Sequence, residues 1–130
     1  MRILYVCNGN SFRSPAAEGL TRKYHPDLEV ESAGIRIATH IAENTKQFLK
    51  QRDAEKYLKS RPDQLTQRAI DEADIIIAMQ KEQKEFIEDS FHLEDKEFKV
   101  WNIEDPITPK ITPKEALNKI EKKVKNLSIA

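Results

Sequence analysis

The segment from Cys7 to Arg13 carries the residues best suited to chemistry, and it begins where a short apolar run ends. Cys7 is the only cysteine of the chain, so it cannot form an internal disulfide or build a structural zinc site alone. A thiol and a guanidinium flank residues that must wrap tightly, and successive backbone N–H groups in such a loop can cradle an oxyanion. Gly9 permits a positive φ there and Asn10 tolerates one. We therefore expect an anion-binding loop that comprises Asn8, Gly9, Asn10, Ser11, Phe12 and Ser14.

Cys7 and Arg13 complement this loop chemically. The planar guanidinium of Arg13 matches two oxygens of a phosphate group. The positive field of the loop stabilises a thiolate on Cys7, which would make it a strong nucleophile near neutral pH. Simpler explanations exist, because a cysteine at the end of a core strand is often only a small hydrophobe and Phe12 is of a type usually found in cores. Cys7 shares its loop with Arg13, and the loop lies between a strand and a capped helix. This context favours a catalytic nucleophile.

Strands and helices alternate along the chain. Apolar patterns predict strands near residues 1–6, 28–32, 74–79 and 98–103, and helices near 14–24, 41–52, 66–73, 81–90 and 112–127. Ser14 is expected to cap the first helix, with Pro15 in the first helical position and Glu18 in the first turn. Thr112 and Glu115 have the spacing of a capping box at the start of the last helix. Residues 53–63 are charged and predict only a loop or a short helix.

This alternation predicts an α/β fold, a three-layer open sheet of four parallel strands with helices on both faces. Ligands of such sheets bind beyond the carboxyl ends of the strands. Cys7 follows the first strand and Asp105 follows the fourth, so we expect the topology to bring both to the same rim. Without that context, Asp105 before Pro106 would be an ordinary turn residue.

Length and charge narrow the classes of function. The chain has 130 residues, with 22 basic and 22 acidic side chains, which fits one small soluble domain over residues 1–130. The balanced charge gives no reason to expect nucleic acid or a membrane surface as a partner, and we expect a monomer. The longest apolar run, residues 75–79, is far below the ~20 residues of a bilayer span, and no signal peptide is recognisable, so we expect a cytoplasmic protein. The three histidines show no ligand spacing, and we expect neither a metal nor a cofactor.

Four motifs together resemble the low-molecular-weight protein tyrosine phosphatases, with their relatives the thioredoxin-coupled arsenate reductases and bacterial protein-arginine phosphatases. Residues 6–15 with Glu18 look like the family's phosphate loop and helix start, and residues 32–34 are similar to its Ser-Ala-Gly. Residues 73–79 resemble its third strand, and Asp105–Pro106 its general-acid loop. The resemblance spans nearly the whole chain and implies the strand order 2-1-3-4 and a metal-free phosphatase.

The resemblance implies that phosphorylated proteins are hydrolysed through a phosphocysteine intermediate. Cys7 would be the nucleophile, Arg13 and the loop amides would hold the phosphoryl oxygens, and Asp105 would act first as acid and then as base. Phosphotyrosine is the first expectation for the substrate.

Several residues depart from the family pattern. Phe12 stands where a second cysteine is common, and Ile107–Thr108 replace the aromatic residues that often follow the Asp-Pro pair. Ser11 lies where tyrosine-specific relatives carry an aliphatic residue and arginine-specific ones a threonine, which favours a protein-arginine phosphatase as the alternative. Arsenate reduction needs further thiols, which the chain lacks. A non-catalytic phosphate-binding module is the alternative from another class.

Overall fold

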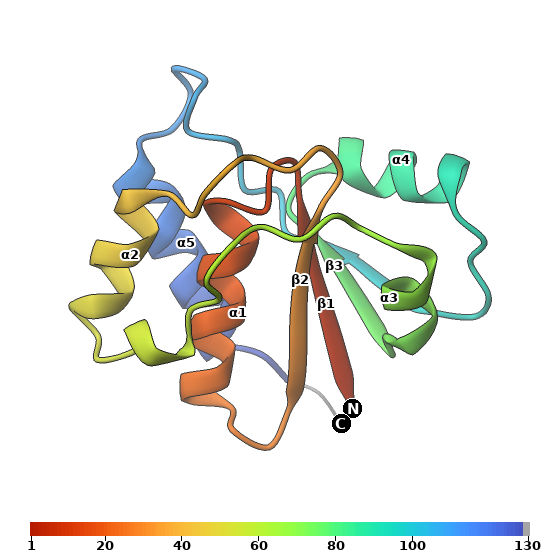
Figure 1. Cartoon of the computed structure of the whole chain (residues 1–130), viewed down its shortest axis with the longest axis horizontal. Helices are drawn as coiled ribbons and strands as arrows, with labels where there is room; N and C mark the ends of the chain where they lie inside the picture. The colour runs from red at the N-terminus through yellow and green to blue at the C-terminus, as the bar shows by residue number, and fades with distance from the viewer. Residues whose placement is uncertain (129–130) are drawn as a thin grey trace.

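The computed structural model describes residues 1–128 and contains four parallel strands in one sheet, in the order β2-β1-β3-β4 (Figure 1). The strands are β1 (Arg2–Cys7), β2 (Glu29–Gly34), β3 (Ile75–Ala78) and β4 (Glu97–Val100). The predicted α/β class and strand order are confirmed. The expected single domain over residues 1–130 includes two residues outside the described part, and it stays a prediction.

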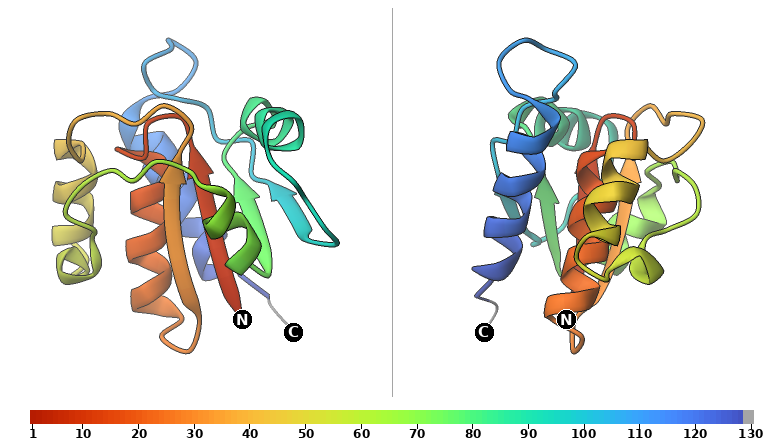
Figure 2. Two further views of the ribbon diagram at one scale, coloured as in Figure 1. Left: turned by 45° about the vertical axis from the view of Figure 1, so that its right-hand side comes forward. Right: turned by 90° about the vertical axis from the view of Figure 1, so that its left-hand side faces the viewer.

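Helices cover both faces of the sheet, which gives three layers (Figures 1 and 2). One face packs against α1 (Arg13–Tyr24) and α5 (Pro113–Lys125), with α2 (Glu43–Lys50) on the outer side of these two helices, and the other face packs against α3 (Gln67–Glu72) and α4 (Lys81–Ser90). A single turn of 3-10 helix, η1 (Glu55–Tyr57), follows α2. Within residues 1–128, every helix is too short or too polar to traverse a lipid bilayer.

The alternation of side chains along β1 builds two separate cores. Ile3 and Tyr5 point into the core under α1 and α5, whereas Leu4 and Val6 point into the core under α3 and α4. Because both faces are covered, β1 is buried from Ile3 to its end, as is typical of a central parallel strand. The hydroxyl group of Tyr5 forms a hydrogen bond of 2.7 Å with Thr21 Oγ1, and burial raises the pKa of this phenol.

The register of the strands brings their carboxyl ends together at one edge. Cys7 lies opposite Gly34 of β2, and Val6 lies opposite Ala78 of β3. Beyond β4 the chain continues to pair, because the N–H of Trp101 donates to the Ala78 carbonyl and the N–H of Ile103 to the Met79 carbonyl. This extension carries the following residues toward the end of β1.

Local expectations were correct for most elements but wrong at Gly9 of the loop and at Ser14, Pro15 and Glu18 of the first helix, where Pro15 is the third helical residue instead of the first. The helix over 81–90 and the capping box at Thr112 are confirmed, and residues 53–63 contain only η1. However, α1 begins at Arg13, so Ser14 lies inside the first turn and does not cap the helix, and Glu18 lies beyond that turn. Gly9 does not have a positive φ, whereas Asn10 does, with φ of 50°. The left-handed bend of the loop therefore falls on Asn10 alone.

Candidate active site

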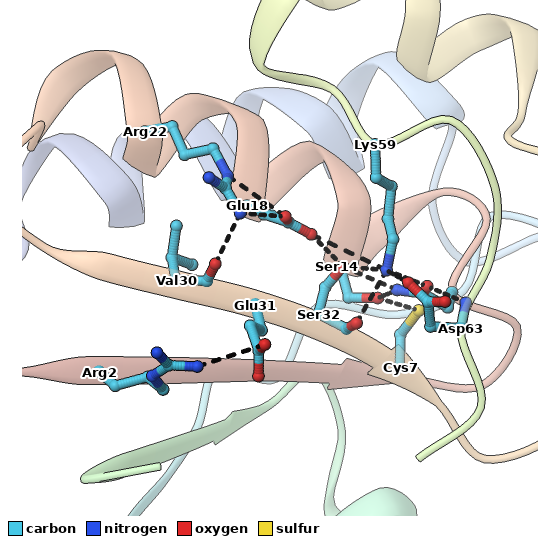
Figure 3. A network of polar contacts seen from close by, with 11 residues as sticks. Arg2, Cys7, Ser14, Glu18, Arg22, Val30, Glu31, Ser32, Lys59 and Asp63 are labelled. Atoms are coloured by element: carbon cyan, nitrogen blue, oxygen red, sulfur yellow. Dashed lines mark hydrogen bonds and ion pairs between the residues drawn. The ribbon is translucent and has the colours of Figure 1, made fainter. Parts of the chain in front are cut away.

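Cys7 ends β1 and is almost fully buried, and its sulfur has one close polar neighbour. The Sγ atom lies 2.9 Å from Ser14 Oγ on the first turn of α1 (Figure 3). The Ser14 oxygen also accepts a hydrogen bond of 2.8 Å from Asn10 Nδ2. Because this bond occupies a lone pair of the hydroxyl, the Ser14 proton is free to be donated to sulfur. The arrangement can stabilise a thiolate on Cys7.

The backbone of the loop is turned so that its amides face inward. The carbonyls of Cys7, Asn8, Gly9 and Ser11 accept hydrogen bonds from the N–H groups of Ile35, Arg36, Ala38 and Ala42. In a trans peptide the carbonyl and the next N–H point in opposite directions, so the N–H groups of residues 8, 9, 10 and 12 point toward the centre of the loop. None of these four amides donates to another atom within residues 1–128. Four free amides that face one centre could bind an oxyanion, and this role of the loop stays a prediction.

Arg13 is held rigidly beside these amides. Its guanidinium is only 2% exposed, and Nη1 donates to Gln80 Oε1 at 2.6 Å and to the Ile103 carbonyl at 2.8 Å. Nη2 lies 3.5 Å from Asp105 Oδ2, a long contact that leaves it available to another acceptor. Nε and Nη2 are thus the donors that remain for a bound oxyanion, and their fork matches two of its oxygens.

Asp105 stands across the pocket on the segment after β4. Its Oδ1 atom accepts a hydrogen bond from the Ile107 N–H, and its side chain is a quarter exposed. A cavity of about 310 Å³ opens between this carboxylate and the loop. Its lining comprises Cys7, Gly9, Ser11, Phe12, Arg13, Ala38, Ala42, Asp105, Pro106 and Ile107.

The structure thus divides the predicted site residues into two groups. Six of them line the cavity, namely Cys7, Gly9, Ser11, Phe12, Arg13 and Asp105. The side chains of Asn8, Asn10 and Ser14 instead bind protein groups, because Asn8 accepts from Gln83, Asn10 donates to Ser14 and Ser14 meets Cys7. The backbone amides of Asn8 and Asn10 still face the centre of the loop, whereas Ser14 acts through its hydroxyl, which lies 2.9 Å from the Cys7 sulfur.

Several supporting residues escaped sequence-based prediction. Gln80 is the N-cap of α4 and Gln83 lies in its first turn, where Gln83 accepts a hydrogen bond from the Gln80 N–H in a capping box. Gly34 touches the loop so closely that a Cβ atom would lie 2.8 Å from the Asn10 nitrogen. The Nζ atom of Lys59 donates a hydrogen bond of 2.7 Å to Asn10 Oδ1. Two signals were available in the sequence: Gly34 belongs to the Ser-Ala-Gly motif of residues 32–34, and Gln80 follows the buried strand β3 closely.

No site for a metal was found in the part of the chain that the structure describes. Residues 1–128 contain no group of three or more His, Cys, Asp or Glu side chains arranged to hold an ion. The positive charge of the pocket comes from Arg13 and from the backbone amides. The expectation of a metal-free and cofactor-free protein stays a prediction.

Comparison with known proteins agrees with this geometry. Residues 2–130 match the model of the family described as low molecular weight phosphotyrosine protein phosphatase. The chain is 39% identical over 93 residues to a protein-arginine-phosphatase of Geobacillus stearothermophilus, which covers 69% of this chain and 62% of that protein. It is 34% identical over 113 residues to the low molecular weight protein-tyrosine-phosphatase PtpB of Staphylococcus aureus, over 75% of this chain and 70% of that one.

Solved structures share the fold. The crystal structure of an arsenate reductase from Archaeoglobus fulgidus superposes with a TM-score of 0.75 and 28% sequence identity, and the match covers 95% of each chain. The chain spans between 22% and 70% of the length of the curated relatives it matches.

Proposed function

Because the chain belongs to the low molecular weight phosphotyrosine protein phosphatase family, we propose that it is a cysteine-dependent phosphatase of phosphorylated proteins. The observation that carries this proposal is the single cavity in which Cys7, Arg13 and Asp105 meet a loop of free amides. These groups supply a nucleophile, a fork for phosphoryl oxygens and a proton donor, which are the parts that phosphoryl transfer requires.

In the first step the Cys7 thiolate attacks phosphorus in line with the leaving oxygen. The bond between sulfur and phosphorus forms as the bond between phosphorus and the leaving oxygen breaks. Asp105, in its protonated form, gives its proton to that oxygen. The amides of residues 8, 9, 10 and 12, together with Nε and Nη2 of Arg13, hold the equatorial oxygens.

In the second step water hydrolyses the phosphocysteine. Asp105, now ionised, takes a proton from water as the water oxygen attacks phosphorus, and the bond between sulfur and phosphorus breaks. Inorganic phosphate leaves, and the Cys7 thiolate regains its hydrogen bond from Ser14. The same carboxyl group therefore serves both steps in opposite protonation states.

Phosphotyrosine is the substrate that the cavity walls favour. Five apolar side chains line the cavity above the loop, namely Phe12, Ala38, Ala42, Pro106 and Ile107. They can pack against an aryl leaving group. Ile107 is 88% exposed, and it stands where members of the family often carry an aromatic residue that contacts the phosphotyrosine ring.

Phosphoarginine is the second candidate, and the Geobacillus relative supports it. A guanidinium leaving group needs hydrogen-bond acceptors in the cavity. Asp105 is one, and Ser11 Oγ can be another, since it donates its own proton to the His40 carbonyl at 2.7 Å and keeps a free lone pair. Arsenate reduction fits less well, because Cys7 has no second cysteine with which to form a disulfide.

The decisive assay compares peptides of one sequence that carry phosphotyrosine, phosphoarginine or phosphoserine, with wild-type protein and Cys7→Ser. We expect hydrolysis that depends on Cys7 and is fastest for phosphotyrosine, while Cys7→Ser still binds phosphate because the amides and Arg13 survive. Faster release from phosphoarginine would select the alternative. Phosphate binding without any Cys7-dependent hydrolysis would show a binding module. We further propose a monomer that acts in the cytoplasm, which sedimentation and fractionation would test.

A further inference from the structure

A groove between the edge strand β4 and the last helix, α5, encloses a cavity of about 830 Å³. Four lysines line this lysine groove, namely Lys99, Lys119, Lys122 and Lys123. Trp101 also lines it and is 8% exposed. Within residues 1–128, no Asp or Glu belongs to the lining, and none of the lining residues belongs to the cavity above Cys7. The lysine groove is therefore a surface separate from the candidate active site.

The lysines of α5 share one face of the helix and lack acidic neighbours. Positions 119, 122 and 123 are three or four residues apart, so their ammonium groups lie close to one another and repel. Within residues 1–128 none of the three forms an ion pair, because Glu121 of the same helix binds Arg52 instead. The helix dipole favours basic residues in the last turn of α5. It does not account for Lys119, which precedes that turn, or for Lys99 on β4.

The charge of the groove differs from that of the whole chain. The chain has 22 basic and 22 acidic side chains, whereas the lining of the groove has four lysines and no carboxylate. Lys99 has one partner outside the lining, Glu97 at 3.3 Å, but both side chains are about half exposed, so water screens this pair. A local excess of positive charge of this kind attracts an anionic partner.

β4 also carries backbone groups that no other strand uses. It is the outermost strand of the sheet, next to β3 only (Figure 2). The N–H of Trp101 donates to the Ala78 carbonyl, toward β3. Because backbone groups alternate between the two edges of a strand, those of Lys99 also face β3, whereas those of Phe98 and Val100 face away from the sheet. An extended segment of another chain can pair with this open edge.

The spacing of the lysines fits the side chains of such a segment. α5 lies roughly lengthwise to the strands (Figure 2), and Lys119 and Lys123 are ~6 Å apart along its axis, at 1.5 Å per residue. Every second side chain of an added strand would point toward α5, at intervals of ~6.6 Å. We propose that the lysine groove binds an extended acidic segment of a partner protein, which pairs with β4 and directs alternate carboxylates onto the lysines of α5.

Other occupants use only part of this surface. Pairing of β4 with β4 of a second copy would bring the two sets of lysines together, and like charges across an interface are costly. A nucleic acid would contact the lysines through its phosphates, but it does not offer the alternating donors and acceptors that pair with a strand. An acidic strand uses both features. The inference goes beyond the proposed function, and its test needs no phosphatase activity.

The fluorescence of Trp101 reports on the groove, because it is the only tryptophan of the chain and belongs to the lining. The probe is a short peptide of alternating Glu and Thr with blocked ends, added to the wild-type protein at low ionic strength. We expect a saturable change in fluorescence that weakens as salt is added. A peptide of alternating Lys and Thr should cause none. The absence of saturable binding by the acidic peptide would overturn the proposal.

A pair of matched variants locates the binding. Lys119→Gln with Lys123→Gln should weaken the affinity for the acidic peptide about fivefold, since each exposed ion pair contributes about two- to threefold. Lys46→Gln with Lys50→Gln removes two exposed lysines at the same spacing on α2 and should leave the affinity unchanged. Circular dichroism checks the fold of both proteins. Equal affinities of the two variants would contradict binding at the lysine groove.

Amide hydrogen exchange tests strand pairing on the wild-type protein and needs no variant. With the acidic peptide bound, the N–H groups of Phe98 and Val100 should exchange more slowly by about tenfold or more, because they gain hydrogen bonds. The N–H of Lys99, which faces β3, should change far less. Binding that leaves the exchange of Phe98 and Val100 unchanged would show attraction of charge alone and overturn the proposed strand pairing.

Two comparisons distinguish the other occupants. An oligothymidylate that binds more tightly than the acidic peptide at the same salt concentration would identify a nucleic acid as the occupant and overturn the proposal. Sedimentation equilibrium of the wild-type protein and of Lys119→Gln with Lys123→Gln detects a second copy. Self-association of the wild type that is lost in this variant would likewise overturn the proposal, whereas we expect both proteins to sediment alike.

Discussion

Replacing Gly34 with alanine should displace the phosphate loop and with it the reacting groups. A Cβ atom at Gly34 would lie 2.8 Å from the Asn10 nitrogen and 2.9 Å from the Asn8 oxygen. Ordinary contacts begin at 3.4 Å, so the loop backbone must retreat by about half an ångström. Misplacing reacting groups by 1 Å can cost about 10²-fold in rate, so we expect kcat/KM to fall by about 10- to 10²-fold.

The same substitution should cost about 1–2 kcal/mol of the free energy of unfolding, since overpacking outweighs the lower entropy of the unfolded alanine chain. Gly19→Ala is the matched control. Its Cβ would meet the flexible tip of Leu49 in the core under α1, away from the cavity lining.

Urea unfolding and p-nitrophenyl phosphate hydrolysis measure both quantities on both variants. Gly19→Ala should lose stability and keep kcat/KM, whereas Gly34→Ala should lose both. Wild-type kcat/KM in Gly34→Ala, or equal activity losses in the two variants, would refute the link between this close contact and the geometry of the loop.

Three other predictions follow from side chains around the site and the core. Asp105→Asn should slow phosphopeptide hydrolysis far more than hydrolysis of p-nitrophenyl phosphate, whose leaving group needs little protonation. Glu104→Gln, outside the cavity lining, is the control, and equal losses on both substrates would contradict general acid catalysis. Peroxide without added thiol should inactivate the protein irreversibly, because Cys7 has no second cysteine to trap its sulfenic acid. Recovery of mass and activity after reductant would argue against this. Burial opposes charge on Glu121, but hydrogen bonds from Arg52 and Tyr24 outweigh it and hold the pKa of Glu121 below its ordinary value. Glu121→Gln should therefore cost about 1–2 kcal/mol of unfolding free energy at neutral pH, and the difference should vanish below the folded pKa, as urea titrations at both pH values would show.

The alternation of apolar runs and helical patterns was enough to predict the sheet and the rim on which Cys7 and Asp105 meet. Both depend on local periodicity and on a general rule for parallel sheets. The same local rules misplaced Ser14, because a serine before proline is typical of a helix cap. In the folded chain its hydroxyl turns to Cys7 and Asn10, and α1 begins at Arg13.

The residues behind the loop could not be predicted, because their partners are distant in sequence. Lys59 contacts Asn10 across 49 positions, and Arg13 contacts Gln80 across 67. No periodicity marks such pairs. Lys59 also stands in a charged segment whose composition gives no preference for helix or strand, so only the tertiary structure shows that its side chain is 11% exposed.

Trapping the covalent intermediate tests the central claim most directly. Wild-type protein and Asp105→Asn are mixed with p-nitrophenyl phosphate and quenched in acid within the first turnovers, and peptide mass spectrometry then locates any phosphoryl group. We expect one phosphoryl group on the peptide that contains Cys7, accumulating more in Asp105→Asn because the base for the second step is lost. Steady hydrolysis with no phosphoryl group on Cys7, or with one on another residue, would contradict the mechanism.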